Sequence, residues 1–314
     1  MTPGLLGALC AFGAVLFFSV NDTLIKFLSG DYPLHEVVLL RAGIGLIVTM
    51  IFIAPFHGGF GVFSTTRLSA HLTRAGFTVI ANIAYYLGLA AMPMAQATAI
   101  FFICPILITL FSMVFLKESV GPWRWAAIVI GFVGVLIVVR PGAVAFQAAA
   151  LMPVAAAVCY AGFHTMTRRM GTTESAATMS VYVQLTFIVV SVAIGLAVGD
   201  GRFGDHDNPS LAFLLRGWHW PAPDDYVFFA IIGGGVACAS FLIAQAYRVA
   251  PPAFVAPFEY AAMPLAVFWG WLVFNEWPTA LTFLGIALIM GAGILTVWRE
   301  AVNAQLARRP KVRR

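Results

Sequence analysis

The amino-acid sequence predicts an all-α membrane protein, with ten transmembrane helices arranged as two inverted five-helix repeats. Three observations carry this prediction: the composition, the spacing of apolar runs and an internal repeat. Of the 314 residues, 61% are hydrophobic and only 10% are charged, and the mean hydropathy is +0.93. Soluble domains carry about 25% charged residues. A soluble fold of this length cannot bury so much apolar surface, so we expect lipid to be its solvent.

The charge-poor runs define the individual helices, because about 20 mostly apolar residues are needed to cross the hydrocarbon core. The first run lacks a basic leader and is longer than the core of a signal peptide, so we expect it to stay as a helix. The charge-free stretch 75–116 is long enough for two helices, with a turn at 92–96. The other expected spans are 5–28, 35–55, 123–140, 147–167, 176–198, 226–247, 252–274 and 279–298.

The basic residues predict the orientation. Ten spans place both termini on one side, and most lysines and arginines fall in the segments of that side, including the tail Arg308 to Arg314. Positive charge favours the cytoplasmic face, so both termini are expected in the cytoplasm and the chain in the cell inner membrane. The loop 199–225 would then lie outside, with a short interfacial helix. Because the charges follow topology, we expect no nucleic-acid partner.

An internal repeat predicts the domain organisation. Shifting the sequence by 159 residues superposes several prolines, glycines and arginines in order, namely Pro93 on Pro252, Pro105 on Pro264, Gly134 on Gly293 and Arg140 on Arg299. The predicted units are residues 1–140, residues 141–300 and a basic cytoplasmic tail at 301–314. Five spans per unit is an odd number, so the second unit would insert upside down. Inverted repeats are typical of secondary transporters, whose site lies near the membrane midplane.

Several chemistries find no support in the sequence. The four cysteines stand singly in apolar runs, which favours neither a metal site nor disulfides. The run GGGVACAS is followed by no G-K-[ST], and neither H-E-x-x-H nor G-x-S-x-G occurs, so we expect no enzyme and no cofactor. The expected partners are a small-molecule substrate and the bilayer. Proton coupling stays open, as does the choice between monomer and homodimer, and a channel or membrane-embedded sensor is the alternative of a different class.

Four stretches resemble a known family: FFSVNDTLIKFL with HEVVLLRAG, AMPMAQATAIFFICPILITLFSMVFLKESVGPWRW, and APFEYAAMPLAVFWGWLVFNEWP. Over nearly its whole length the chain resembles the EamA type of the drug/metabolite transporter superfamily. Both halves show A-x-A, a mid-helix proline and a terminal acid, here Glu118 and Glu276. The resemblance implies ten helices around a central cavity, and either uptake of metabolites or export of amino acids or drugs. The details look closest to a branch with S-adenosylmethionine and riboflavin importers.

Glu259 is the lone acid in the apolar stretch APFEYAAMPLAVFWGW, residues 256–271. Acids within the membrane are costly and usually face a cavity or a partner. We expect Glu259 to bind a substrate amine or to cycle a proton; the alternatives are a structural ion pair and snorkelling of the side chain to the cytoplasmic interface. Pro257 and Pro264 flank it, and Pro105 occupies the matching helix of the first half. Each removes a backbone donor, so these three are expected hinges.

Other polar residues suggest a gate and a binding surface. Asp22 and Lys26 share one helix face, and Arg41 enters from the outer end of the second span. We expect an ion-pair cluster at an outer gate, with direct substrate binding as the alternative. Amphipathic side chains suit a cavity for a planar or zwitterionic solute, with core filling as the alternative. The candidates are Asn82, Tyr85, Tyr86, Tyr160 and Tyr260.

Overall fold

The fold is described by a computed structural model that covers residues 3–52, 54–57, 59–116, 122–140, 148–170, 176–249, 255 and 258–308. These residues form helices and connecting turns and contain no strand, so the all-α prediction is confirmed. The α-helices are α1 (Pro3–Leu28), α2 (Leu34–Phe52), α3 (Leu68–Ala91), α4 (Met94–Phe101), α5 (Cys104–Leu116), α6 (Pro122–Val139), α7 (Leu151–Met170), α8 (Ala176–Val198), α9 (Pro209–Leu215), α10 (Tyr226–Val249), α12 (Ala262–Phe274) and α13 (Ala280–Arg308). Short 3-10 turns occupy Ala54–His57, Gly59–Phe63, Ala148–Ala150 and Pro223–Asp225.

Most of the helices are built to face lipid. Among the described residues, six stretches are long and apolar enough to cross a membrane, and three shorter apolar helices accompany them. Large apolar side chains such as Ile51, Phe132 and Leu196 are exposed on the outside of the bundle. Helix α3 packs along α7 and α8, and its polar residues His71, Arg74 and Thr78 are buried. Each expected span coincides with helix, although the start of the 252–274 span lies outside the described residues.

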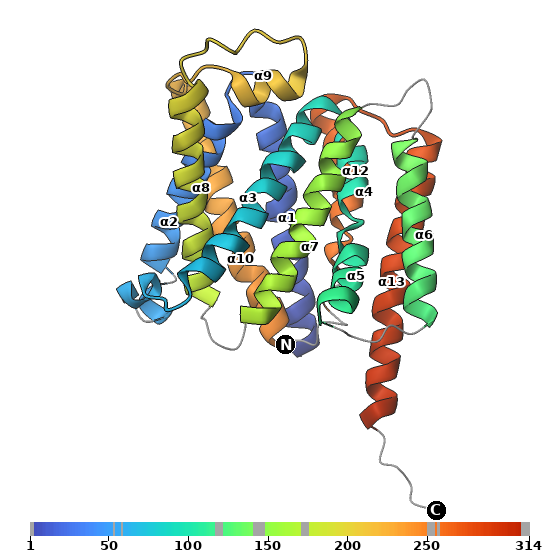
Figure 1. Ribbon diagram of the computed structural model, residues 1–314. Helices are drawn as coiled ribbons and strands as arrows, with labels where there is room; N and C mark the ends of the chain where they lie inside the picture. The colour runs from blue at the N-terminus through green and yellow to red at the C-terminus, as the bar shows by residue number, and fades with distance from the viewer. Residues whose placement is uncertain are drawn as a thin grey trace, which may run out of the picture.

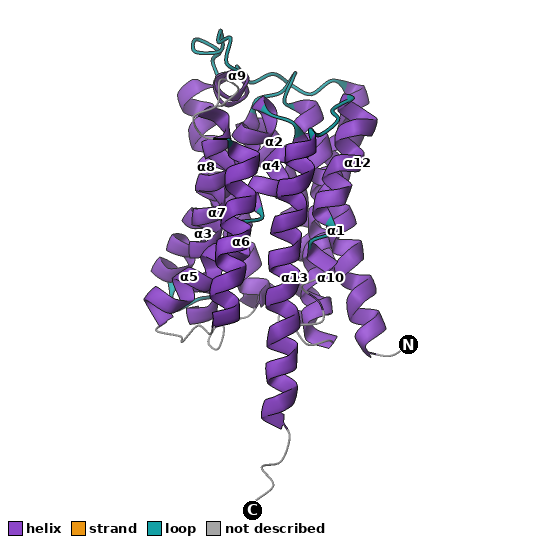
Figure 2. Ribbon diagram, turned by 90° about the vertical axis from the view of Figure 1, so that its right-hand side faces the viewer, coloured by secondary structure: helices purple, strands orange, loops and turns teal. Residues whose placement is uncertain are grey.

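The two ends of the bundle differ. Helix α1 begins and α13 ends at the same end, called here the terminus end (Figures 1 and 2). The short helix α9 covers the opposite end, called the α9 end. Asn208 caps α9 by accepting hydrogen bonds from Ser210 N at 3.0 Å and Leu211 N at 3.2 Å, which explains why a helix starts there. Helix α13 continues to Arg308, so the predicted tail begins as helix.

Contacts between helices are reciprocal when the two halves are exchanged. Helix α1 packs on α10, and α7 packs on α3. Helix α2 packs on α8, α4 on α12, and α6 on α13. If α1, α2, α3, the pair α4 and α5, and α6 correspond in order to α7, α8, α10, α12 and α13, each of these contacts has its counterpart. The inverted relation of the halves stays a prediction, and this pattern is the packing that it would require.

Helices α6 and α13 approach through their backbones. A Cβ on Gly285 would lie 2.8 Å from the carbonyl oxygen of Gly134 and 2.3 Å from the Val138 side chain. Neither distance leaves room for a side chain, so glycine is required at position 285. Small residues of this kind let membrane helices pack closely where apolar burial gives little driving force.

Candidate functional site

Two helices break at the centre of the bundle. Helix α4 ends at Phe101 and α5 begins at Cys104, with a turn at 102–103 directly before Pro105. A second turn at 260–261 precedes α12 and its Pro264. Each proline lacks the N–H that would bond the carbonyl four residues earlier, so the helix opens there. Two of the three expected hinges therefore stand at observed breaks, and Pro257 lies outside the described residues.

Aromatic rings fill the space around both breaks. Ring centroids lie 4.9 Å apart for Tyr85 and Phe101, and 5.4 Å apart for Phe101 and Tyr160. Across the halves, Phe102 at the first break lies 5.5 Å from Tyr260 at the second. These five residues are called the aromatic column below. The expected tyrosines are thus brought together at the contact between the halves, and Tyr85 and Tyr260 are buried in this conformation.

A buried polar cluster lies beside the aromatic column, towards the α9 end. It consists of Asn21 and Asp22 from α1, Arg41 from α2, and Asn82 and Tyr86 from α3. Arg41 donates to the Tyr86 hydroxyl at 3.0 Å and to Asn82 Oδ1 at 2.8 Å. The Tyr86 hydroxyl donates to Asp22 Oδ1 at 3.2 Å, and Asn21 Nδ2 donates to Tyr86 Oη at 3.0 Å. One tyrosine hydroxyl therefore joins three helices.

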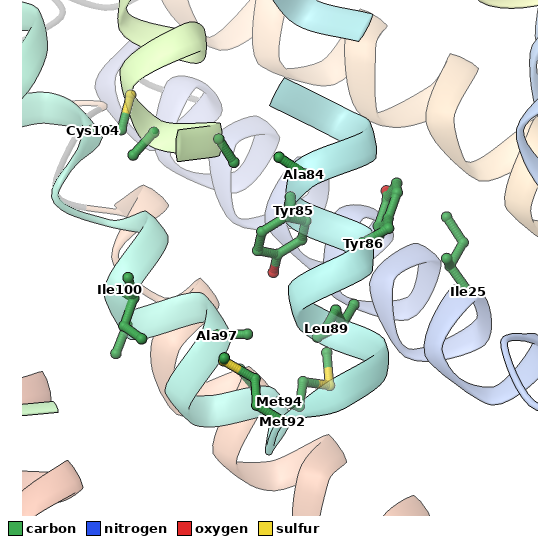
Figure 3. Packing of buried hydrophobic residues seen from close by; sticks show 14 of the residues in the cluster. Ile25, Ala84, Tyr85, Tyr86, Leu89, Met92, Met94, Ala97, Ile100 and Cys104 are labelled. Carbon is green, nitrogen blue, oxygen red and sulfur yellow. The ribbon is translucent and has the colours of Figure 1, made fainter. Parts of the chain in front are cut away.

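Helix α3 contributes to both the polar cluster and the aromatic column, because consecutive side chains leave a helix in different directions. Tyr86 points towards α1, whereas Tyr85 points towards α4 (Figure 3). The Tyr85 hydroxyl hydrogen-bonds with Thr98 of α4 at 3.2 Å and donates to Asp22 Oδ2 at 3.3 Å. Asp22 thus accepts hydrogen bonds at both carboxylate oxygens. Tyr85 is the physical link between the polar cluster and the aromatic column.

The expected ion-pair cluster of Asp22, Arg41 and Lys26 needs correction. Arg41 reaches Asp22 through Tyr86, and Lys26 donates to Glu276 Oε1 at 2.6 Å. Lys26 also donates to the Met92 carbonyl at 2.7 Å. Spacing does place Asp22 and Lys26 on one helix face. Lys26 lies one turn nearer the helix end, however, where its long side chain reaches the other half of the protein.

Local backbone chemistry positions Glu276. Asn275 ends α12 in the left-handed conformation, with φ of 57°. The Asn275 N–H then bonds the Trp271 carbonyl at 3.2 Å, as in an αL C-cap, and the Glu276 N–H bonds the Gly270 carbonyl at 2.9 Å. This turn aims the carboxylate at the start of α4, where Glu276 Oε2 accepts from Met94 N at 2.9 Å. A carboxylate at a helix N-terminus is favourable, so one residue joins α1, α4 and α12.

Glu259 lies at the level of the helix breaks. Its carboxylate is close enough to Cys104, Tyr160 and Tyr260 to act on them electrostatically. The residue is half-buried, and these three neighbours place it at the contact between α5, α7 and the second break. The structure therefore brings Glu259 together with two of the expected tyrosines. Glu118, the terminal acid that matches Glu276 in the first half, lies outside the described residues.

The sequence does not single out Arg74, a basic residue directly before the charge-free stretch 75–116. The structure places it inside α3, where it is 6% exposed. Its Nε donates to Thr167 Oγ1 at 2.7 Å, its Nη1 donates to the Met179 carbonyl at 3.0 Å, and its guanidinium lies 4.4 Å from the Phe163 ring centroid. The surplus of polar residues over 67–91 is the signal that could have marked α3 as a helix surrounded by protein.

The α9 end is closed over the site. Arg216, after α9, donates to the Ser29 carbonyl at 2.9 Å and to the Tyr32 carbonyl at 3.3 Å. The Tyr32 ring stacks on His219, and its hydroxyl donates to Asp225 at 2.5 Å. These contacts tie the segment 199–225 to the turn between α1 and α2. Together with Lys26 and Glu276 they close this end of the bundle.

Broken helices that meet inside a helical membrane bundle are typical of secondary transporters. Comparison with known proteins indicates the same class of protein. The EamA-like transporter family matches residues 5–140 and again residues 147–298, and the chain belongs to this family. It is a membrane transporter of small molecules and not an enzyme.

Individual relatives extend along the whole chain. A riboflavin transporter of Vibrio cholerae is 32% identical over 302 residues, which cover 93% of each chain. An S-adenosylmethionine uptake transporter of Rickettsia bellii is 25% identical over 282 residues, which cover 90% of each chain. A solved crystal structure with 19% identity covers 96% of this chain and 98% of its own, with a TM-score of 0.64, and shows the same fold.

Proposed function

We propose that this protein carries riboflavin, or a similar planar heteroaromatic metabolite, across the inner membrane by alternating access. The observation that carries the proposal is the aromatic column at the two helix breaks, joined by Tyr85 to a buried polar cluster. Aromatic faces bind a flat ring, and the polar groups at one end give it an orientation. The similarity to a riboflavin transporter over nearly the full length supports this choice of substrate.

Transport would occur by movement of the two halves around the site. The units 1–140 and 141–300 are proposed as inverted repeats, supported by the two matches to the family and by the reciprocal helix contacts. The conformation described is closed at the α9 end, where Lys26 of the first half bonds Glu276 of the second. We propose this pair as the gate of the α9 end. Opening it would let the halves separate at that end while the other end closes.

Glu259 is proposed as the residue that couples transport to a proton or binds a basic group of the solute. Its position at the second break, beside Tyr160 and Tyr260, supports this role, because substrate and coupling-ion sites of such transporters lie at broken helices. A carrier of an uncharged vitamin needs a second solute for uphill transport. A carboxyl group at the membrane midplane can supply the proton site that such coupling requires.

Both termini are proposed to lie in the cytoplasm, with the α9 end outside. The arrangement of both termini at one end and the basic residues of that side support this orientation. Labelling of single cysteines placed in the 199–225 segment by a membrane-impermeant reagent in intact cells tests it. Labelling from outside supports the proposal, and labelling only after lysis contradicts it.

Growth of a bacterial riboflavin auxotroph that lacks its own importer tests the substrate. Expression of the chain should restore growth at low external riboflavin. S-adenosylmethionine uptake is measured in the same cells with labelled compound. Growth rescue without S-adenosylmethionine accumulation supports the riboflavin proposal. Accumulation of S-adenosylmethionine alone would replace it with that substrate, and poorer growth than the empty strain would indicate export.

A further inference from the structure

The polar cluster contains a buried acceptor without a hydrogen-bond partner. Asn21 is 3% exposed, and its Oδ1 accepts no hydrogen bond from the part of the chain that the structure describes. The orientation of this amide is determined by its surroundings, because Asn21 Nδ2 donates to Tyr86 Oη and, at 3.1 Å, to Asp22 Oδ1. A carboxylate only accepts, so a flipped amide would set oxygen against oxygen. Buried polar atoms without partners are rare in native proteins and need an explanation.

The same cluster contains an open donor. Arg41 donates to Asn82 Oδ1, and a guanidinium has donors only, so the amide oxygen must face it. Asn82 Nδ2 then points away from Arg41 and makes no hydrogen bond among the described residues. Asn82 is only half-buried, unlike Asn21. The Asn82 amide is therefore held in place through Oδ1, and its Nδ2 is left available to donate to a ligand.

The two unused atoms belong to one small site next to aromatic surface. Asn21 and Asn82 both hydrogen-bond to the pair formed by Tyr86 and Arg41, which are themselves 3.0 Å apart. The neighbouring Tyr85 ring lies 5.5 Å from the Tyr86 ring and 4.9 Å from Phe101. An acceptor, a donor and tilted aromatic rings are therefore combined where three helices of the first half meet the second.

We propose that Asn21 and Asn82 determine specificity by binding the imide edge of a flat ring, an inference that rests on the proposed function. Such an edge presents a carbonyl, an N–H and a second carbonyl in a row, as the isoalloxazine ring of riboflavin does. Asn21 Oδ1 accepts the ring N–H, and Asn82 Nδ2 donates to an adjacent ring carbonyl. The aromatic column binds the faces of the ring system.

Counterflow in proteoliposomes with riboflavin and N3-methylriboflavin tests this assignment. The methyl group replaces the hydrogen on the ring nitrogen, which removes the donor and leaves the ring system flat. The wild-type chain should transport riboflavin with a kcat/KM at least about tenfold above that of the methylated compound, since a site that binds an N–H rejects an analogue without it. Asn21→Leu should bring the ratio close to one, mainly through a higher KM for riboflavin.

Gln184→Leu is the matched control. Gln184 of α8 is also an amide whose Oε1 is buried without a partner, and its Nε2 donates to Thr49 at 3.1 Å, away from the polar cluster. This variant should keep the wild-type ratio. Asn82→Leu is a second, independent variant that can be used if Asn21→Leu does not fold. We expect it also to lower the ratio of kcat/KM for riboflavin to kcat/KM for the methylated compound.

The outcomes separate the two proposals. Equal transport of both compounds by the wild-type chain overturns the imide assignment while leaving riboflavin transport intact. A ratio that Asn21→Leu and Asn82→Leu both leave unchanged also overturns it. Absence of any riboflavin counterflow overturns the proposed function, and the assignment that rests on it falls at the same time.

Discussion

The gate at the α9 end can be tested by removing the carboxylate of Glu276. Glu276→Ala deletes a charge-assisted hydrogen bond of 2.6 Å to Lys26 and another of 2.9 Å to the start of α4. Hydrogen bonds to charged groups contribute about 1.5–3 kcal/mol, and a carboxylate at a helix N-terminus adds about 0.3–1 kcal/mol. Their sum is discounted because the Glu276 side chain is 26% exposed.

After this discount, Glu276 stabilises the closed conformation by about 1.5–3 kcal/mol. Its loss shifts the ratio of molecules closed at the α9 end to molecules open there by about 10- to 100-fold, at about 1.4 kcal/mol per factor of ten. Cys104 is a natural reporter, because it stands at the first helix break and is only 4% exposed. In a variant whose other three cysteines are replaced, we expect Cys104 to react about 10- to 100-fold faster with a membrane-impermeant maleimide applied at the α9 end.

Asp200→Ala is the control for this experiment. Asp200 forms an ion pair of 3.2 Å with Arg202 in the segment that covers the same end, but both side chains are more than half exposed. Exposed pairs contribute little, so this variant should label at the wild-type rate. An unchanged labelling rate in Glu276→Ala would refute the gate, since the pair would then bias no equilibrium between conformations.

The remaining predictions concern packing, the helix breaks and the central acid. Gly285→Leu should destabilise the protein by about 1–3 kcal/mol or more, because the new side chain would meet backbone, and this appears as a lower thermal midpoint of unfolding in detergent. Gly291→Leu, which has open space at its Cβ, should leave the midpoint unchanged. Pro105→Ala returns a backbone donor to the first break and should slow counterflow severalfold without loss of folding; unchanged rates would contradict a hinge there. Glu259→Gln should abolish transport while the protein still inserts and elutes as a monodisperse species, and wild-type transport in this variant would leave the acid structural.

The sequence predicts those features that depend on local composition. Charge-poor runs locate the helices because lipid enforces a minimum apolar length. Prolines predict the helix breaks because the loss of a backbone donor is a local effect. Tyr85, Tyr160 and Tyr260 were recognised as a group because aromatic residues with a polar handle are unusual within apolar runs.

Partners that are distant in sequence could not be predicted. Lys26 and Glu276 lie 250 positions apart, and their pairing depends on how the two halves pack. Local spacing instead suggested Asp22 as the partner of Lys26. Arg74 could not be recognised as buried, because a charge near the end of an apolar run looks the same whether it lies in a loop or inside a helix packed on protein. The unsatisfied Oδ1 of Asn21 is likewise visible only once its neighbours are known.

Counterflow of labelled riboflavin into proteoliposomes preloaded with unlabelled riboflavin tests the central claim most directly. A carrier that alternates between its two sides accumulates label transiently above the external concentration, and the initial rate saturates. We predict this transient for the purified full-length chain. Non-saturating flux without a transient would contradict alternating access and favour a channel, and the absence of riboflavin flux from folded protein would contradict the proposed substrate.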